Sequence, residues 1–300
     1  MKVVVSGGTG FIGKRVVERL LLDGHSVSVL SRKPANEKHA VASFAWDPLS
    51  EEPPAESVNG MDAVMHLAGE PVNQRWDAEV KKRILDSRVL GTRHLVDAIA
   101  RATHRPKILV STSAVGYYGE RGDEVLNERS GPGKGFLADV CKGWEAEALR
   151  AETLGVRVIR LRIGFVLGRD GGALDQILPV FRMGLGGPLG SGKQWMPWIH
   201  AADVAGLFAF ALESPASAVW NAVAPHPVTN TEFTRALAKA VHRPAIFPVP
   251  GFALQLMFGE LGQHMLDSAR VLPDGALKAG YVFSYPGLNE ALPSLVAKRH

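Results

Sequence analysis

Three glycines at a spacing of three open the first helical pattern of the chain. Gly7, Gly10 and Gly13 form G-x-x-G-x-x-G directly after the apolar run 3–5. Glycines at these positions allow a tight turn and a close approach of the backbone to a pyrophosphate. The helix N-terminus adds free N–H groups and a partial positive charge. The segment predicts a dinucleotide-binding turn, with a purely structural turn as the alternative.

The second apolar segment ends in residues that bear on which dinucleotide would bind. It reads Leu30-Ser31-Arg32-Lys33, with no carboxylate that would favour the ribose hydroxyls of NAD. A guanidinium suits a 2′-phosphate through paired, charge-assisted hydrogen bonds, and Ser31 offers another donor. These residues predict NADP(H); the alternative is a solvated basic turn.

Apolar runs alternate with helical patterns over the first half of the chain, and this alternation would position the glycine turn. Strands are expected over 3–5, 27–30, 44–46, 63–67, 108–111 and 156–162. Helices are expected over 10–22, 78–102, and up to about 153 before the last of these strands. The alternation predicts an α/β fold: a Rossmann-type, doubly wound parallel sheet with a smaller C-terminal substrate lobe.

The strand–helix pattern fades after residue 167, which defines the expected domains. Residues 1–167 are predicted to form the NADP-binding domain, with a returning helix near 201–222. Residues 168–200 and 223–300 are predicted to form the substrate-side lobe.

The glycine-rich segment 184–192 is expected to be a mobile surface loop over the nicotinamide end of the cofactor. Trp195, Trp198, Arg75 and Trp76 are predicted to line a pocket for a ring-bearing or anionic substrate. The alternative for the tryptophans is core or interface packing.

Composition excludes several classes of protein. The 300 residues are 46% hydrophobic and 21% charged with a net charge of +4, and the basic residues form no cluster of the kind that nucleic-acid binding requires. Cys141 is the single cysteine, so no internal disulfide forms and a cytoplasmic location is expected. No apolar run reaches the length of a membrane span, and no His/Cys spacing resembles a zinc site. The expected partner is a small molecule, and the expected state is a monomer or homodimer.

Several motifs resemble those of the extended and atypical short-chain dehydrogenase/reductases, the group that includes the nucleotide-sugar epimerases. They are the glycine turn 7–13, His66-Leu67-Ala68-Gly69, Ser111-Thr112-Ser113-Ala114, and Trp198-Ile199-His200-Ala201-Ala202-Asp203. A closer match is to a subfamily of uncharacterised epimerase-like proteins with their own C-terminal domain. It rests on Gly69-Glu70-Pro71-Val72-Asn73, Arg75-Trp76, Ser87-Arg88, the segment 186–192 and Arg270-Val271-Leu272-Pro273.

The resemblance implies a set of cofactor contacts and a substrate side, but no particular substrate. Asp47 matches the acidic residue at adenine, and Ser113 matches the serine or threonine near the nicotinamide. The F-I-H-x-x-D-like segment places His200 on the substrate side. The implied cofactor contacts are Gly7, Thr9, Gly10, Phe11, Ile12, Gly13, Ser31, Arg32, Asp47, Leu67, Ala68, Gly69, Glu70 and Arg88.

The catalytic pair that the resemblance leads one to expect is absent. Enzymes of this superfamily usually carry Y-x-x-x-K on a helix, where the lysine lowers the pKa of the tyrosine so that the phenol exchanges a proton during hydride transfer. No Y-x-x-x-K occurs in this chain. In the expected helix, Lys142 has Ala138 four residues before it; if Glu145 sets the register instead, Cys141 and Leu137 stand in the two places.

Other protic side chains are candidates to replace the missing tyrosine. Tyr117 and Tyr118 follow the serine strand and could face the nicotinamide, while Ser113 could polarise a carbonyl. Glu70 or His200 could transfer protons. The alternatives are packing roles for the tyrosines, a structural pair of His200 with Asp203, and a small buried apolar role for Cys141.

These residues predict an NADP(H)-dependent oxidoreductase or epimerase of a small molecule, with a non-standard proton donor. The alternative is a catalytically silent NADP(H)-binding sensor or interaction protein, which the missing pair favours.

Overall fold

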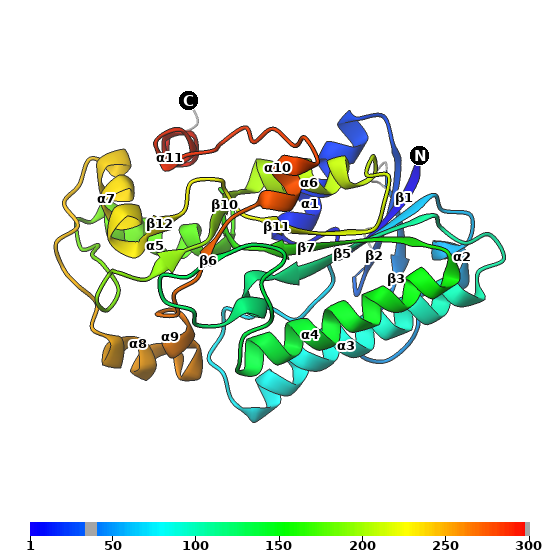
Figure 1. Cartoon of the computed structure of the whole chain (residues 1–300), viewed down its shortest axis with the longest axis horizontal. Helices are drawn as coiled ribbons and strands as arrows, with labels where there is room; N and C mark the ends of the chain where they lie inside the picture. Colours follow the sequence, from blue (N-terminus) through cyan, green and yellow to red (C-terminus); the bar gives the residue numbers. More distant parts are fainter. Residues whose placement is uncertain (34–40, 298–300) are drawn as a thin grey trace.

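The computed structural model describes residues 1–33 and 41–297, and its centre is a seven-stranded parallel sheet (Figure 1). The strand order is β11-β7-β5-β4-β1-β2-β3. The strands are β1 Lys2–Ser6, β2 Ser26–Ser31, β3 Ala42–Ala45, β4 Ala63–His66, β5 Ile108–Ala114, β7 Arg157–Ile163 and β11 Ala218–Ala222. The order reverses between β1 and β4, so the cleft for a ligand is expected at the carboxyl ends of these two strands.

Helices cover both faces of the sheet because successive strand side chains point to opposite faces. Val3 and Val5 pack with the helices α1 (Phe11–Leu22) and α6 (Ala201–Ala211), whereas Val4 packs against the other face. That other face carries α2 (Ala55–Val58), α3 (Ala78–Arg101) and α4 (Phe136–Leu149), and α3 and α4 lie side by side beneath the sheet in Figure 1. The predicted doubly wound α/β fold is confirmed.

The rest of the chain forms a substructure of short elements beyond the carboxyl edge of the sheet. Three two-stranded pairs, β10–β8, β12–β9 and β13–β6, tie it together. The strands are β6 Val125–Leu126, β8 Phe165–Leu167, β9 Trp195–Met196, β10 Trp198–His200, β12 Val228–Thr229 and β13 Arg270–Val271. Its helices are η1 Val115–Tyr118, α5 Gly172–Arg182, α7 Asn230–Val241, α8 Gly251–Phe258, α9 Glu260–His264 and α11 Leu288–Val296. Two further helices pack on the central sheet instead: η2 Arg150–Leu154 against α3, α4 and β7, and α10 Asp274–Lys278 against β11.

The glycine-rich segment 184–192 does not lie free on the surface as expected. Gly190 N–H donates to the carbonyl of Val249 at 2.9 Å, and Val249 N–H donates to the carbonyl of Pro188 at 2.9 Å. A Cβ at Gly187 would stand 1.9 Å from the carbonyl oxygen of Phe247. Gly187 therefore serves close packing against residues 247–248, and the segment is tied to Val249 by backbone hydrogen bonds.

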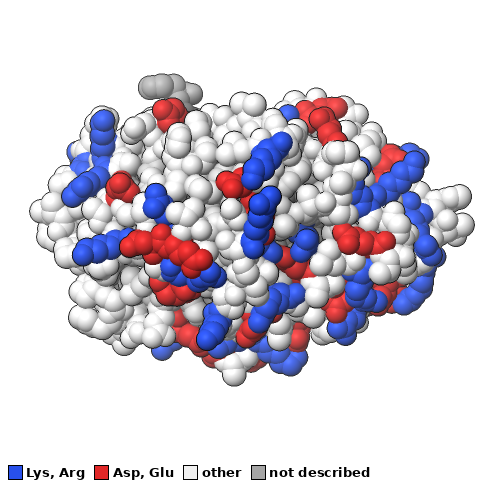
Figure 2. All heavy atoms as spheres, viewed as in Figure 1, with Lys and Arg blue, Asp and Glu red and all other residues white. Residues whose placement is uncertain are grey.

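The surface shows no large patch of one charge on the face drawn in Figure 2. Lysine and arginine side chains lie interspersed with aspartate and glutamate there. Among the helices of the described residues, none is both long and apolar enough to span a bilayer.

Candidate functional site

The predicted cofactor turn lies between β1 and α1, at the reversal of strand order. Gly10 is the N-cap of α1, and no side chain caps the helix, so its first N–H groups keep their hydrogen-bonding capacity. Gly10 N–H donates to the carbonyl of Gly7 at 3.0 Å. A Cβ at Gly13 would stand 2.1 Å from the same carbonyl oxygen. The turn is thus as tight as the spacing predicts, and it leaves an open helix N-terminus.

A buried serine fastens the turn after β4 to the turn after β1. Ser6 Oγ accepts hydrogen bonds from the N–H groups of Leu67 at 3.1 Å and Ala68 at 3.2 Å. The hydroxyl also lies 2.7 Å from Nδ1 of His66. Burial, together with the positive charge of Arg88, lowers the pKa of His66 to about 3. The Ser6 hydroxyl, itself bonded to a neutral imidazole, therefore holds residues 67 and 68 of the predicted cofactor segment beside the glycine turn.

The residues predicted to contact the adenosine end come together at the ends of β2 and β3. Thr9 Oγ1 lies 3.4 Å from Ser31 Oγ, which joins the glycine turn to β2. Arg32 is exposed immediately after Ser31. Asp47 follows β3, the neighbour of β2, and its Oδ1 accepts from Leu49 N–H at 3.1 Å.

Ser113 belongs to a buried ionic network at the end of β5. Its hydroxyl donates to Glu145 Oε1 at 2.7 Å. Arg162 donates to both oxygens of Glu145, from Nε at 2.7 Å and from Nη2 at 2.9 Å, and Arg160 Nη1 reaches Oε2 at 2.9 Å. Although burial opposes ionisation, the hydrogen bonds and charge of Arg162 hold the pKa of Glu145 below its usual value. Ser113 is therefore bonded to a carboxylate rather than free to polarise a carbonyl.

The two candidate tyrosines lie in different environments. Tyr118 is fully buried; its hydroxyl donates to Asn221 Oδ1 at 2.8 Å and accepts from Arg162 at 3.0 Å. Tyr117 is half-buried, and the guanidinium carbon of Arg162 lies 3.4 Å from the centre of its ring. Within the described residues, the Tyr117 hydroxyl makes no hydrogen bond and is not among the buried unpartnered atoms. Tyr118 is thus a core residue, which corrects its assignment as a proton donor.

The structure decides between the two registers for the missing tyrosine–lysine pair. A Cβ at Gly116 would stand 3.1 Å from Leu137 Cβ, and Cys141 Sγ lies 3.6 Å from the carbonyl oxygen of Ala114. Leu137 and Cys141 therefore face the end of β5, and they occupy the positions expected for the tyrosine and the lysine of the Y-x-x-x-K motif. Burial raises the pKa of Cys141 to about 11, so its thiol stays neutral and is no nucleophile.

The guanidinium of Arg88 lies between α4 and the turn that follows β4. Arg88 of α3 donates from Nη1 to the carbonyl of Glu70 at 2.9 Å. A Cβ at Gly69 would stand 3.3 Å from its guanidinium carbon. Glu70 N–H donates to Ser87 Oγ at 2.9 Å, which fixes the end of the β4 turn on α3.

Two of the predicted substrate residues are core residues. Trp198 is 1% exposed and packs in the cluster that also holds Phe233 and Leu292. Trp76 is 6% exposed, and its ring packs against Phe136 at a centroid distance of 5.4 Å. These assignments to a pocket wall are corrected, because side chains so deeply buried present no surface to a ligand.

The other two substrate candidates remain accessible but lie at different places. Trp195 is half-buried; its Nε1 donates to Asp123 at 2.8 Å, and the guanidinium of Arg270 lies 4.4 Å from its ring centre. Arg75 is exposed beside Gly259, next to the bridge between Trp76 and Gly259.

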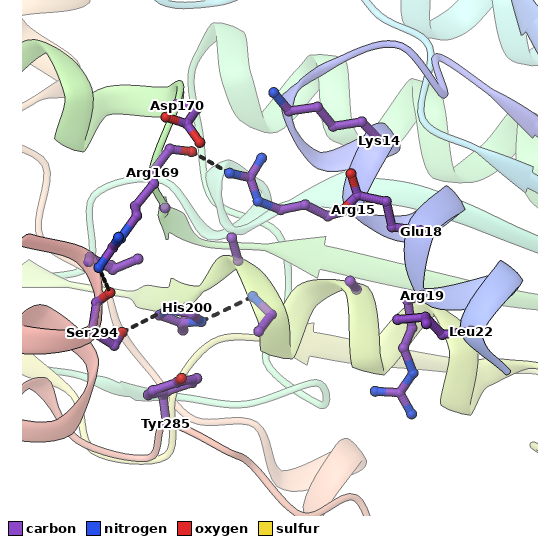
Figure 3. A pocket seen from close by; sticks show the side chains of 15 residues that line it. Lys14, Arg15, Glu18, Arg19, Leu22, Arg169, Asp170, His200, Tyr285 and Ser294 are labelled. Atoms are coloured by element: carbon purple, nitrogen blue, oxygen red, sulfur yellow. Dashed lines mark hydrogen bonds between the residues drawn. The ribbon is translucent and has the colours of Figure 1, made fainter. Parts of the chain in front are cut away.

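His200 lies apart from the serine strand, in a surface cavity between α1, α6 and α11 (Figure 3). Its Nδ1 accepts from Ala202 N–H at 3.1 Å, and Nε2 lies 3.3 Å from Ser294 Oγ. Its ring stacks on Tyr285 at 3.8 Å. Burial and the charge of Arg15 lower the pKa of His200 to about 4. It caps α6 as a neutral ring. The alternative role, a pair with Asp203, is not seen, because that carboxylate accepts from Ser284 and Tyr285 N–H instead. The substrate-side role of His200 stays a prediction.

Sequence reasoning missed the roles of Glu145 and Arg162. The available signal was the pattern Arg160-Leu161-Arg162 inside a buried parallel strand, because a cation buried there needs a carboxylate partner. No cluster of side chains able to hold a metal ion occurs in residues 1–33 and 41–297.

Comparison with known proteins agrees with this fold. Residues 3–222 match the NAD dependent epimerase/dehydratase family, and residues 249–295 match a domain of unknown function. The chain belongs to the NAD dependent epimerase/dehydratase family. Two relatives are the chloroplastic homolog of epimerase family protein SDR39U1 from Arabidopsis thaliana, 43% identical over 99% of this chain and 87% of that protein, and SDR39U1 of Homo sapiens, 39% identical over 99% and 100%.

Solved structures of this family resemble the chain closely. Human SDR39U1 (isoform 2), crystallised with NADPH, has a TM-score of 0.90 and 38% identity, covering 98% of this chain and 99% of that one. A nucleoside-diphosphate sugar epimerase from Corynebacterium glutamicum has a TM-score of 0.79 and 33% identity, covering 97% of this chain and 57% of that one.

Proposed function

We propose that this protein binds NADP(H) at the carboxyl edge of the sheet and acts as an oxidoreductase or epimerase of a small molecule, with Tyr117 as the proton donor. When bound, the nicotinamide supplies or accepts a hydride. The substrate would enter from the side formed by residues 168–200 and 223–297.

The glycine turn and the end of β2 support NADP(H) as the cofactor. The uncapped N-terminus of α1 suits a pyrophosphate, since its first N–H groups have no side-chain acceptor. Arg32 is exposed directly after β2, and no carboxylate precedes it on β2, which supports its assignment to a 2′-phosphate. The human relative crystallised with NADPH supports the same assignment.

The environment of Tyr117 is the observation that carries the catalytic proposal. Its hydroxyl is accessible and unbonded within the described residues, directly after the strand that ends at Ala114. Arg162 holds the ring by stacking on its face, and the ion pair with Glu145 in turn fixes Arg162. A phenol held this way can donate a proton to a substrate oxygen or accept one from it.

Replacing Tyr117 by phenylalanine tests the role of the hydroxyl, because the ring and its stacking are kept. Tyr117→Phe is expected to lower kcat by about 10²–10⁴-fold and to leave NADPH affinity unchanged. The assay follows NADPH absorbance with a panel of aldehydes, ketones and nucleoside-diphosphate keto sugars.

Tyr118→Phe is the matched control for this test. It should lower the free energy of unfolding by about 1–2 kcal/mol through its lost buried hydrogen bonds and change kcat little. Equal kcat values for wild type and Tyr117→Phe would remove Tyr117 from the mechanism. If NADPH binds tightly but none of the candidate substrates oxidises it, the alternative of a catalytically silent NADP(H)-binding sensor is favoured instead.

A further inference from the structure

Helix α8 is apolar on nearly every side and yet lies at the surface. The helix, Gly251–Phe258, contains one polar side chain, that of Gln255. A helix that is apolar all round is normally enclosed by a protein core or by a membrane. Here only Leu254 is buried, whereas Phe252 and Leu256, one helical turn apart, are 74% and 75% exposed. The helix therefore turns large apolar side chains outward, and no other described part of the chain covers them.

Further exposed apolar side chains lie on the segments that adjoin this helix. Ile246 and Phe247 precede α8, and Leu185 follows α5. Phe247 N–H donates to the carbonyl of Gly186 at 3.2 Å, which joins the two segments. Helices α5, α7 and α8 lie at the same end of the molecule, at the left of Figure 1. The α8 surface consists of six side chains that are 52–75% exposed: Leu185, Ile246, Phe247, Phe252, Leu256 and Met257.

The charges beside the α8 surface are basic. Residues 176–194 and 233–259, which supply this surface, contain no aspartate or glutamate. Their exposed cations include Arg182, Lys239 and Arg243. Arg243 Nε donates to the carbonyl of Arg182 at 3.2 Å, so these two arginines lie together at the end of α5. The region over α8 itself, at the lower left of Figure 2, is almost free of charged side chains. The α8 surface is thus an apolar area bordered by cations.

This combination of apolar and basic side chains restricts what can cover the α8 surface. A twofold contact between two copies would bring the same cations together, and neither copy's segments would supply a carboxylate to pair with them. A protein partner would need cavities that match Phe252 and Leu256. An anionic lipid bilayer needs no matching shape: interfacial helices insert phenylalanine and leucine below the headgroups, while lysine and arginine attract acidic lipids.

We propose that the α8 surface docks this protein on an anionic lipid bilayer. Phe252 and Leu256 enter the boundary between headgroups and acyl chains, and Arg182 and Arg243 contact the phosphates of acidic lipids. The eight residues of α8 are too few to cross a bilayer, so the helix lies in the plane of the interface. Docking of this kind is independent of the proposed reaction.

Co-sedimentation with lipid vesicles tests the docking. The protein is expected to pellet with vesicles made of equal parts of phosphatidylcholine and phosphatidylglycerol, and to stay in solution with pure phosphatidylcholine. The bound fraction should fall as salt is added, because salt screens the attraction between exposed charges.

Two double variants separate the apolar and the electrostatic contributions to docking. Phe252→Ser with Leu256→Ser is expected to lower the partition coefficient by about tenfold or more, since two apolar side chains no longer enter the interface. Arg182→Gln with Arg243→Gln is expected to lower it by about tenfold and to weaken its dependence on salt.

Leu22→Ser with Val282→Ser is the matched control. These two side chains are 85% and 84% exposed and lie outside the α8 surface, so their loss should leave the partition coefficient unchanged. The thermal midpoint of the Phe252→Ser, Leu256→Ser protein should equal that of wild type, because neither side chain is buried. An equal midpoint separates a loss of docking from a loss of folding.

Three results would overturn the proposal. The first is a wild-type protein that does not pellet with the anionic vesicles, which would leave a protein partner to cover the surface. The second is a Phe252→Ser, Leu256→Ser protein that pellets as well as wild type. The third is a dimer, detected by light scattering without vesicles, that the same double variant converts to monomer, because a second copy would then cover the α8 surface.

Discussion

Two adjacent tyrosines differ in their surroundings, and this difference separates a core residue from the proposed proton donor. Tyr117 and Tyr118 follow the same strand and look equivalent in sequence. Within η1, the Tyr118 hydroxyl donates a hydrogen bond to Asn221, whereas the half-buried Tyr117 ring packs against the Arg162 guanidinium. Their different surroundings come from β7 and β11, which lie far along the chain, so no local pattern could separate them.

The proposed choice between two dinucleotides rests on one side chain, Arg32. Replacing it by alanine is expected to weaken NADPH binding by about 10–100-fold, because a charge-assisted bond to the 2′-phosphate is lost. NADH affinity should hardly change, so the ratio of the two dissociation constants narrows. Fluorescence titrations with both cofactors measure that ratio.

Lys33→Ala is the neighbouring control for this prediction. Lys33 is exposed like Arg32 but lacks a planar fork for a phosphate, so its loss should change the ratio far less. Equal affinities of the wild-type protein for NADPH and NADH would contradict the role given to Arg32.

At the scale of elements, the sequence predicts the first half of the sheet well. Buried parallel strands appear as short apolar runs, so β1, β2, β4 and β7 are found close to their observed bounds. Helix α3 is also predicted close to its observed bounds, because its amphipathic pattern is long. These sequence patterns reflect local conformational preferences. Such preferences predict the structure correctly where tertiary packing favours the same conformation.

The elements beyond residue 167 are predicted less well, for physical reasons. Helix α5 begins among glycines and contains Pro179, both of which usually interrupt helices. Strand β11 lies within a range expected to be helical, and its pairing with β7 depends on tertiary structure alone. The loop glycines 184–192 are indistinguishable in sequence from a mobile segment, because most atoms they pack against come from residues far along the chain, such as Thr231, Phe247 and Leu266.

The turn between β1 and α1 should fail if one methyl group is added. Gly13→Ala places a Cβ 2.1 Å from Gly7 O and 2.8 Å from Gly8 Cα, and both are backbone atoms that cannot rotate away. The free energy of unfolding is expected to fall by more than about 2 kcal/mol, and NADPH affinity should fall with it. Urea unfolding and cofactor titration measure the two effects.

Gly131→Ala is the control at a glycine without neighbours. A Cβ there would meet nothing within 4 Å, so unfolding free energy should stay within about 1 kcal/mol of wild type. A Gly13→Ala protein as stable as Gly131→Ala would contradict the tight turn.

The whole molecule should lose stability in mild acid because it holds two histidines neutral. The pKa of His66 is lowered to about 3 and that of His200 to about 4, both mainly by burial. Below a pH of about 6.5 the unfolded chain binds a proton at each of these histidines and the folded chain does not. The free energy of unfolding therefore decreases as the pH is lowered. Each group contributes a slope of up to about 1.4 kcal/mol per pH unit.

Unfolding free energies between about pH 7 and 4.5 check this expectation. His66→Asn should lower stability at neutral pH, because bonds to Ser6 and Thr92 weaken, but it should also flatten the pH slope. His104→Asn, at an exposed histidine, serves as the control. A slope that His66→Asn leaves unchanged would contradict the neutral buried ring.

The pairing of β13 with β6 has a consequence for synthesis on the ribosome. Val125 and Leu126 pair with Arg270 and Val271, and the carbonyl of Ser268 accepts a hydrogen bond from Arg121 N–H at 2.9 Å. The nascent chain can assemble most of the sheet while the loop after Tyr118 still lacks these contacts. A nascent chain that has not reached residue 271 would therefore carry the cofactor turn without an ordered loop beside Tyr117.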